Sequence, residues 1–201
     1  MPHQNSLYGL ILIGGRSSRM HKDKAALNYH GKEHALYCYE LLEAICERVF
    51  ISCRRDQAAT DWLKGCDLIF DEPPFTDIGP LGGIMSAMTE YPDQAFLVLA
   101  CDLPFISQAT IAYLLDHRNP KKIATVYRSA HDGLPEPLCA IYERQALAVL
   151  RTFLDQDMHC PRKILSNSDA ELLTLNEEDS LDNVNSLDEY KQAIEQLKNK
   201  S

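Results

Sequence analysis

Short, continuous apolar runs are the feature of this chain that most limits what it can fold into. Three of them dominate the first hundred residues: residues 8–13 (YGLILI), 48–53 (RVFISC) and 95–101 (AFLVLAC). None of the three alternates apolar with polar residues, as a strand with one solvated face would. Continuous runs of this length are typical of strands buried on both faces, as in a parallel sheet that is covered by helices.

Helical patterns lie between these runs. Residues 33–47 carry apolar side chains at helical spacing, and a second helix is predicted at 78–89, where Pro80 suits the first turn. A shorter strand fits at 67–70. This alternation predicts an α/β fold with three layers, α/β/α, and a mostly parallel sheet joined by right-handed crossovers.

Patterns in the second half of the chain are weaker. We predict helices at residues 110–117, 145–154 and 187–198. We predict strands at 122–127 and 138–142, a short strand at 172–175 and a loop at 133–137. Ser186 and Glu189 form a capping box at the start of the last helix. We find no internal repeat, and 201 residues with 45% hydrophobic content suit a single domain over residues 1–201.

Composition excludes several classes of protein. The formal net charge of −9 argues against a nucleic-acid or membrane-surface binder, which would need a broad basic face. The seven cysteines include no Cys-x-x-Cys pair, so neither a zinc site nor a disulfide framework is indicated. The first seven residues do not resemble a signal peptide, and no apolar run is long enough to span a bilayer. A reducing, cytoplasmic location is therefore expected.

The segment after the first predicted strand concentrates positive charge. Gly14 and Gly15 end that strand, where ligands bind in open α/β sheets, and their backbone can be approached closely. The basic residues that follow are Arg16, Arg19, Lys22 and Lys24. Such a cluster beside glycines predicts a phosphate site. Neither the P-loop nor the dinucleotide glycine pattern is present, and the alternative is a solvated surface loop.

Two carboxylates follow later strands. Asp102 comes at the end of the most apolar run, where a hard oxygen ligand suits Mg²⁺, although it could instead cap a turn. Asp71 ends the short strand at 67–70. After it, residues 79–83 (GPLGG) open a helix whose first N–H groups could face a ligand, and the alternative there is a turn with close packing.

Together these segments resemble the molybdenum cofactor guanylyltransferase family, within the MobA-like NTP transferases. The family's opening pattern is roughly L-x-G-G-x-S-x-R-M-G-x-D-K, and residues 12–24 are LIGGRSSRMHKDK. Residues 79–83 match its G-P-L-x-G, 101–104 its C-D-x-P, 136–142 its E-P-L…Y strand and 183–186 its N-x-N-[TS] run. The matches occur in order and span nearly the whole chain.

This resemblance implies a Rossmann-like nucleotidyltransferase fold of the nucleotide-diphospho-sugar transferase type, with GTP as donor, molybdopterin as acceptor and Mg²⁺ as cofactor. It assigns residues to the nucleotide as follows: Leu12, Ile13, Gly14, Gly15, Lys24, Ser52, Asp71 and Asp102. Asp102 would also ligate Mg²⁺. Arg19, Asn183 and Asn185 would lie toward the acceptor, with Arg162 as a further candidate. Ser52 stands where the family can carry Asn, and His21 replaces its glycine.

The implied reaction needs little covalent work from the protein. A phosphate oxygen of the acceptor attacks the α-phosphorus and pyrophosphate leaves, so catalysis is mostly alignment and charge neutralisation by Asp102-bound metal, Lys24 and Arg19. No general base is required, because the acceptor phosphate is already ionised. A transient contact with other molybdenum cofactor proteins is also implied. The alternatives are a cytidylyl- or sugar-phosphate nucleotidyltransferase of the same fold, or a nucleotide-binding module without turnover.

Overall fold

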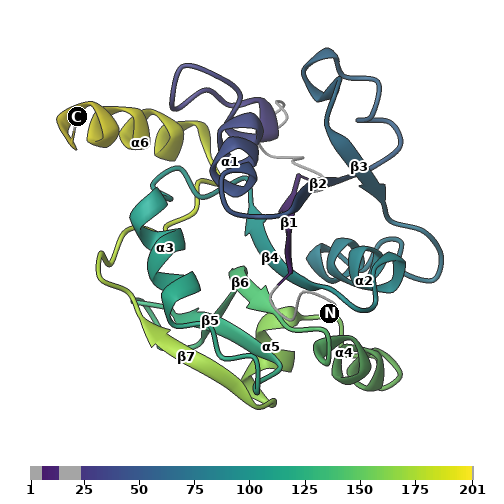
Figure 1. Cartoon of the computed structure of the whole chain (residues 1–201). Helices are drawn as coiled ribbons and strands as arrows, with labels where there is room; N and C mark the ends of the chain where they lie inside the picture. Colours follow the sequence, from purple (N-terminus) through teal and green to yellow (C-terminus); the bar gives the residue numbers. More distant parts are fainter. Residues whose placement is uncertain (1–5, 14–23, 201) are drawn as a thin grey trace.

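A seven-stranded sheet forms the middle of the computed structural model, which describes residues 6–13 and 24–200 (Figure 1). The strands lie in the order β3-β2-β1-β4-β6-β5-β7. Their bounds are β1 Leu7–Leu12, β2 Arg48–Cys53, β3 Asp67–Phe70, β4 Ala95–Ala100, β5 Ala124–Arg128, β6 Pro135–Tyr142 and β7 Ala170–Thr174. β6 runs antiparallel to both neighbours, and the other pairs are parallel. The mostly parallel sheet predicted from the apolar runs is confirmed.

Helices cover both faces of the sheet, which confirms the three-layer architecture (Figure 1). One layer contains α1 (His34–Glu43) and α3 (Gln108–Asp116), and the other contains α2 (Pro80–Glu90), α4 (Ala146–Leu154) and α5 (Pro161–Ser166). Short 3-10 helices occur at η1 (Lys24–Ala26) and η2 (Asp61–Leu63). The last helix, α6 (Leu187–Lys200), packs through Ala193 against a separate small cluster that includes Tyr29 and Val184.

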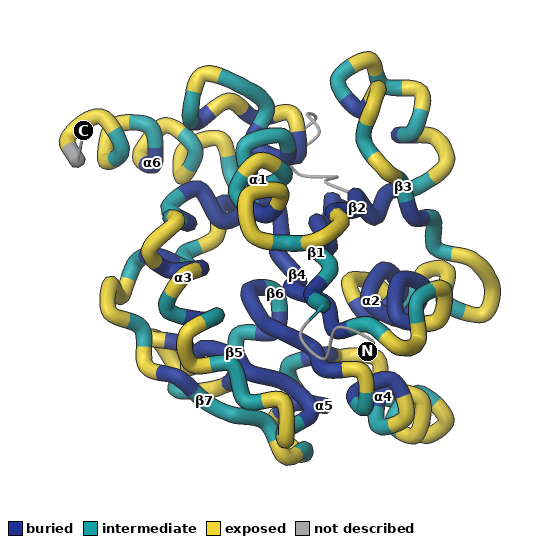
Figure 2. The backbone as a smooth tube through the Cα atoms, viewed as in Figure 1, coloured by how far each residue is buried: buried dark blue, intermediate teal, exposed yellow. Residues whose placement is uncertain are grey.

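The central strands are buried on both faces, as their continuous apolar sequences predict. Leu10 and Ile11 are adjacent in β1, point to opposite faces and are both fully buried. Figure 2 shows the same dark core along β1, β4 and β6. No described helix is both long and apolar enough to cross a bilayer, and the seven cysteines are all free thiols.

Two local expectations are corrected, and one helix was not predicted. The helix predicted at 33–47 ends at Glu43, because the chain then turns toward the sheet. The Glu47 amide already donates to the carbonyl of Leu7 in β1, at 3.0 Å. The loop predicted at 133–137 is partly strand, since β6 begins at Pro135. The glycine and prolines of this segment indicated a loop, but proline is tolerated at the first residue of a strand. α5 was not predicted.

Candidate functional site

The carboxyl ends of four parallel strands meet at one edge of the sheet. Leu12, the last residue of β1, pairs with Ser52 of β2 on one side and with Ala100 of β4 on the other. The pairing continues past the strands, because the Cys101 amide donates to the Leu12 carbonyl at 3.2 Å and the Ile13 amide to that of Ser52 at 3.1 Å. This edge is where open α/β sheets bind ligands.

Asp71 and Asp102 leave the sheet at this edge. Asp71 follows β3 by one residue, and Asp102 follows β4 by two. Both are partly buried. Burial raises the pKa of Asp71, the hydrogen bond from Ser52 lowers it, and the nearby charge of Asp77 raises it further. The Ser52 hydroxyl donates to Asp71 Oδ1 over 3.5 Å, so the two side chains sit side by side at the ends of β2 and β3.

Helix α2 begins directly against this edge because two of its residues lack a Cβ. A Cβ on Gly83 would lie 2.4 Å from Ser52 Oγ, and one on Gly82 would lie 2.4 Å from the carbonyl oxygen of Phe75. Gly79, with a φ of 65°, turns the chain into the helix. The close packing that the sequence left as an alternative is therefore present. The first turn of α2 also stands next to Asp71, since a Cβ on Gly82 would be 3.1 Å from Asp71 Oδ2.

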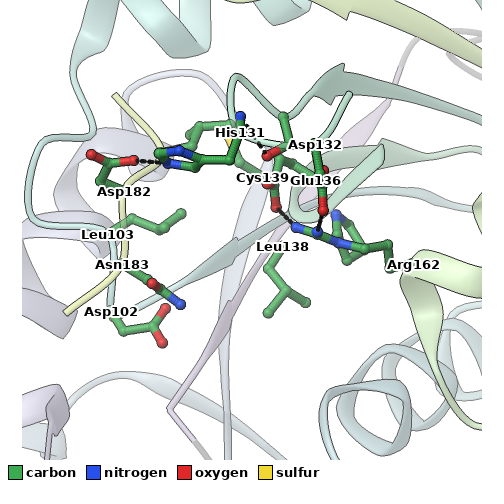
Figure 3. Close-up of a pocket in the computed structure, with 13 residues that line it drawn as sticks. Asp102, Leu103, His131, Asp132, Glu136, Leu138, Cys139, Arg162, Asp182 and Asn183 are labelled. Atoms are coloured by element: carbon green, nitrogen blue, oxygen red, sulfur yellow. Dashed lines mark hydrogen bonds and ion pairs between the residues drawn. The ribbon is translucent and has the colours of Figure 1, made fainter. Parts of the chain in front are cut away.

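A pocket of about 290 Å³ opens beside Asp102, on the β6 side of β4 (Figure 3). Four parts of the chain form it: the turn after β4, the β5–β6 hairpin, the start of α5 and the segment before α6. The lining residues are Asp102, Leu103, Ser129, His131, Asp132, Glu136, Pro137, Leu138, Cys139, Arg162, Leu181, Asp182 and Asn183.

The basic side chains of the pocket are paired with its carboxylates. Arg162 contacts Asp132 at 2.9 Å and Glu136 at 2.6 Å, and both contacts are drawn in Figure 3. His131 Nε2 lies 2.7 Å from Asp182 Oδ1. That hydrogen bond is the main reason why the pKa of His131 is raised. Arg162 is two-thirds buried and held by two carboxylates, so its guanidinium is fixed in the pocket wall and its charge is balanced there.

An irregularity in the β5–β6 pairing shapes the pocket. Val126 pairs with Ala140, but the next residue, Tyr127, pairs with Glu136, so three residues of β6 have no partner in β5. Pro137 lies in this bulge, where it removes no ladder hydrogen bond. The bulge leaves Leu138, between Pro137 and Cys139, as part of the pocket wall.

The segment before α6 reaches the same place through one backbone contact. The Val184 amide donates to the carbonyl of Asp102 at 3.0 Å, and Asn183 beside it lines the pocket. Asn185 is exposed and is not among the lining residues. Its amide donates to Glu189 Oε2 at 2.6 Å, while Ser186 Oγ accepts from the Glu189 amide at 3.2 Å. The predicted capping box is therefore present, except that the amide that donates to the Glu189 carboxylate is that of Asn185, one residue before the N-cap Ser186.

The structure places some of the residues predicted from the sequence at the site, and others lie outside the described residues. Leu12, Ile13, Ser52, Asp71, Asp102 and Asn183 lie at this edge of the sheet or in the pocket beside it. Gly14, Gly15 and Arg19 lie outside the described residues, as does the side chain of Lys24. Sequence reasoning missed Ser129, His131, Asp132 and Asp182. These residues carry no motif of their own, and the only signal was their position next to predicted strand ends or to Asn183.

The donor set suits a magnesium ion that is shared with a phosphate ligand. Among residues 6–13 and 24–200 there is no group of three or more Asp, Glu, His or Cys arranged to hold a metal by themselves. Mg²⁺ in phosphate-transfer sites is bound by one or two carboxylates together with substrate phosphates and water. Asp102 fits that role, as a partly buried carboxylate at the mouth of the pocket.

Known proteins similar to this chain identify its family. Residues 9–172 match the family model of the MobA-like NTP transferase domain. The molybdenum cofactor biosynthesis bifunctional protein of Synechocystis sp. is 38% identical over 94% of the chain, which spans about half (54%) of that relative's length. The probable molybdenum cofactor guanylyltransferase of Flavobacterium johnsoniae is 27% identical, with 92% of this chain and 94% of that protein covered.

A solved structure supports the same assignment at the level of the fold. The molybdopterin-guanine dinucleotide biosynthesis protein A of Archaeoglobus fulgidus superposes with a TM-score of 0.77 at 21% identity, covering 96% of this chain and 99% of that one. At that identity the likeness concerns the fold alone, whereas the family model covers most of the sequence, including the ends of β1 to β4. The chain belongs to the MobA-like NTP transferase family of nucleotidyltransferases.

Proposed function

We propose that this protein transfers GMP from GTP to the phosphate of molybdopterin and releases pyrophosphate, giving the guanine dinucleotide form of the cofactor. The observation that carries the proposal is the position of Asp102. It stands between two halves of one edge: the ends of β1 to β3 on one side and the 290 Å³ pocket on the other. The names of the relatives in Synechocystis and Flavobacterium support the choice of cofactor and nucleotide.

The nucleotide occupies the half formed by the parallel strands. Leu12 and Ser52 form its floor, and Asp71 and the first turn of α2 form its side. The amides at the start of α2 point out of the helix, where the positive end of its dipole favours polar or anionic groups. The segment from Gly14 to Lys24 supplies the positive charge that a triphosphate needs.

The acceptor occupies the pocket beside Asp102. Its phosphate is doubly charged near neutral pH and needs a cationic partner and hydrogen-bond donors. Arg162, fixed by Asp132 and Glu136, would offer its remaining N–H donors and Asn183 its amide, while the metal held by Asp102 would supply the positive charge. Asn185 would have to rotate toward the pocket to contribute, because it is not part of the wall.

The chain's residues act by alignment and by neutralising charge. Asp102 would hold Mg²⁺, which when bound polarises the phosphate oxygens and neutralises their charge. Arg162 and Asn183 orient the acceptor phosphate, while Lys24 and Arg19 stabilise the charge that develops on the pyrophosphate. No side chain has to remove a proton from a phosphate oxygen that is already ionised. His131, the histidine that lines the pocket, is paired with Asp182 and needs no role in proton transfer.

Pyrophosphate release tests the proposal directly. GTP, CTP and ATP are supplied in parallel with Mg²⁺, each with and without molybdopterin. Release from GTP that depends on molybdopterin is the expected result. Release from CTP would assign the cytidylyl activity instead and leave the site unchanged. Triphosphate binding without release under any condition would contradict the transferase proposal and favour a nucleotide-binding module.

Replacing Asp102 by Asn tests the residue on which the proposal depends. The amide keeps the size of the side chain but loses the charge that binds the metal, so turnover should fall roughly 100-fold or more. The melting temperature should change little, because Asp102 is only partly buried. Asp93→Asn is the matched control, since Asp93 is an exposed carboxylate before the opposite end of the same strand. Equal turnover in both variants would remove Asp102 from the mechanism.

A further inference from the structure

Two histidines of another segment contact the turn that follows Asp102. His34, in the first turn of α1, has Nε2 3.0 Å from the carbonyl oxygen of Leu103. His30, four residues earlier, has Nε2 3.1 Å from the carbonyl oxygen of Pro104. Neither histidine belongs to the pocket or to the family pattern described above. Both contacts join residues about seventy positions apart in the chain.

Three successive carbonyls of this turn are thereby engaged from outside it. Asp102 accepts from the Val184 amide, Leu103 from His34 and Pro104 from His30. We call residues 102–104 with these three donors the Asp102 tie. The Leu103 carbonyl also accepts from the Ile106 amide at 3.2 Å, which is a hydrogen bond of the turn itself. Here the backbone on both sides of the Asp102 side chain is fixed by segments that come from different parts of the fold.

The two rings are themselves held in place by stacking. His30 stacks on Tyr37 with ring centroids 3.9 Å apart and planes within 19°, and His34 lies nearly parallel to Tyr37 at 5.7 Å. Tyr29 closes the other side of His34, edge-on at 5.0 Å. Rings packed in this way lose little further freedom when they form a hydrogen bond, so the tie is rigid.

The chemistry of the contacts fixes the state of the rings. A carbonyl oxygen only accepts, so each Nε2 must carry a hydrogen. His34 is fully buried, and its Nδ1 has no hydrogen-bond partner among the residues that the structure describes. The neutral ring with hydrogen on Nε2 therefore satisfies the Leu103 carbonyl without placing a charge in the core.

We propose that His34 and His30 are positioning residues for the metal carboxylate, which they act on through the backbone of Leu103 and Pro104. The inference rests on the proposed function, since it assigns Asp102 to Mg²⁺. The histidines also follow Lys24 closely in the chain, so the same contacts join the segment after the predicted phosphate-binding lysine to the turn that bears Asp102. Such outer partners set the orientation of a metal ligand and affect its affinity.

Replacing His34 by Leu removes the donor and keeps an apolar side chain of similar size. GTP binding is measured by calorimetry with and without Mg²⁺, using the full chain. Binding with Mg²⁺ should weaken about tenfold or more, while binding without Mg²⁺ should change little. His34→Gln, whose amide nitrogen can replace Nε2 as donor, should restore most of the loss. Backbone hydrogen exchange at the amides of residues 102, 103, 105 and 106 in the free protein should accelerate in the Leu variant and not in the Gln variant.

His117→Leu is the matched control. His117 also donates from a ring to a backbone carbonyl, that of Tyr113, and stacks on a tyrosine at 4.0 Å, but it lies at the end of α3. His30→Leu, a change at a half-buried position, serves if the His34 variant does not fold. Equal Mg²⁺-dependent affinity in wild type and His34→Leu overturns the inference, as does equal loss with and without Mg²⁺. If wild type itself binds no triphosphate, the proposed function fails, and the exchange data alone decide whether the histidines fix the turn.

Discussion

His34 illustrates how a buried polar side chain acquires a single allowed state. It is fully buried between Tyr29, Tyr37, His30 and Cys38, and its Nε2 lies 3.0 Å from the Leu103 carbonyl oxygen and 3.7 Å from Cys38 Sγ. Burial is the main reason why its pKa is lowered to about 4; the hydrogen bond to Leu103 raises the pKa, and the neighbouring His30 lowers it further. The folded protein therefore disfavours the protonated ring, whereas the unfolded chain accepts a proton readily.

This difference predicts a loss of stability in acid. The folded pKa of about 4 lies below the unfolded value of 6.5, so the contribution of His34 is complete above 6.5 and disappears as the pH falls toward 4. The expected loss is about 3 kcal/mol in the free energy of unfolding. Urea unfolding of wild type and His34→Gln across this range isolates the effect, because other groups titrate in both. Parallel pH profiles would contradict it.

At the scale of an element, α2 depends on two glycines at positions where helices usually prefer other residues. Alanine in place of glycine normally stabilises a helix by about 1 kcal/mol. At Gly82 the added Cβ would lie 2.4 Å from a backbone oxygen, that of Phe75, which has no side-chain freedom with which to move away. The steric cost therefore outweighs the gain in helix propensity.

Gly82→Ala should reduce the free energy of unfolding by about 1–3 kcal/mol, the usual cost of overpacking, because the start of α2 must move away from the 71–79 segment. The same shift should weaken nucleotide binding, since Asp71 and Ser52 lie beneath this turn. Chemical denaturation and GTP titration measure both effects. Ser86→Ala, which adds no volume to the same helix and removes a buried hydroxyl without a described partner, should be neutral or slightly stabilising. A Gly82 variant as stable as that control would show that the loop yields easily.

Sequence reasoning at this scale succeeded for two neighbouring strands. The strand at 48–53 was predicted with its observed bounds because a run buried on both faces has a sharp apolar signature. The strand at 67–70 also has its predicted bounds, although Ile69 is its one buried residue and it lies at the edge of the sheet, because its short apolar run stops at Asp71. α5 was missed because six residues are too few for a helical period to appear. The β6 start was missed because Pro135 and Pro137 indicate a loop unless the strand begins there and bulges.

At the scale of the whole molecule, one buried ion pair joins elements at the edge opposite the site. Arg118, just after α3, donates from Nε and an Nη to both oxygens of Glu143, which follows β6, at 2.7 and 2.9 Å. The Glu143 side chain is 5% exposed and that of Arg118 14%. Asn119 continues the connection to β7 through Glu171 at 2.8 Å. The helical layer and the second half of the sheet are thus connected by charge as well as by apolar packing.

Arg118→Met should destabilise the fold by about 3–5 kcal/mol, because it leaves Glu143 buried without its partner. Thermal and urea unfolding measure the loss. At temperatures where the variant stays folded, its kinetic constants should match wild type, since the pair is remote from Asp102. Lys64→Met provides the comparison: its partner Asp61 is 91% exposed, so the change should cost less than about 0.5 kcal/mol. Similar effects in the two variants would refute the distinction between buried and exposed pairs.

The candidate site could be predicted only in part, because some of its residues meet only when distant segments of the chain pack together. Asp71 and Asp102 were found because they end apolar runs, and a strand end has a fixed place in a parallel sheet. His131, Asp132 and Asp182 meet only after the hairpin and the segment before α6 have folded onto each other, and no local pattern encodes that meeting. The histidines of the Asp102 tie could not be found from sequence either, because their acceptors are backbone atoms of a distant segment.

The antiparallel direction of β6 determines which part of the site can accept insertions and substitutions. Because β6 starts where β4 and β5 end, the hairpin between β5 and β6 grows directly over the pocket, while its other end faces away. Residues 129–134 can therefore be lengthened or replaced without altering the register of β1 to β4. One half of the ligand edge is fixed by the geometry of a parallel sheet, and the other can be rebuilt by altering a single turn.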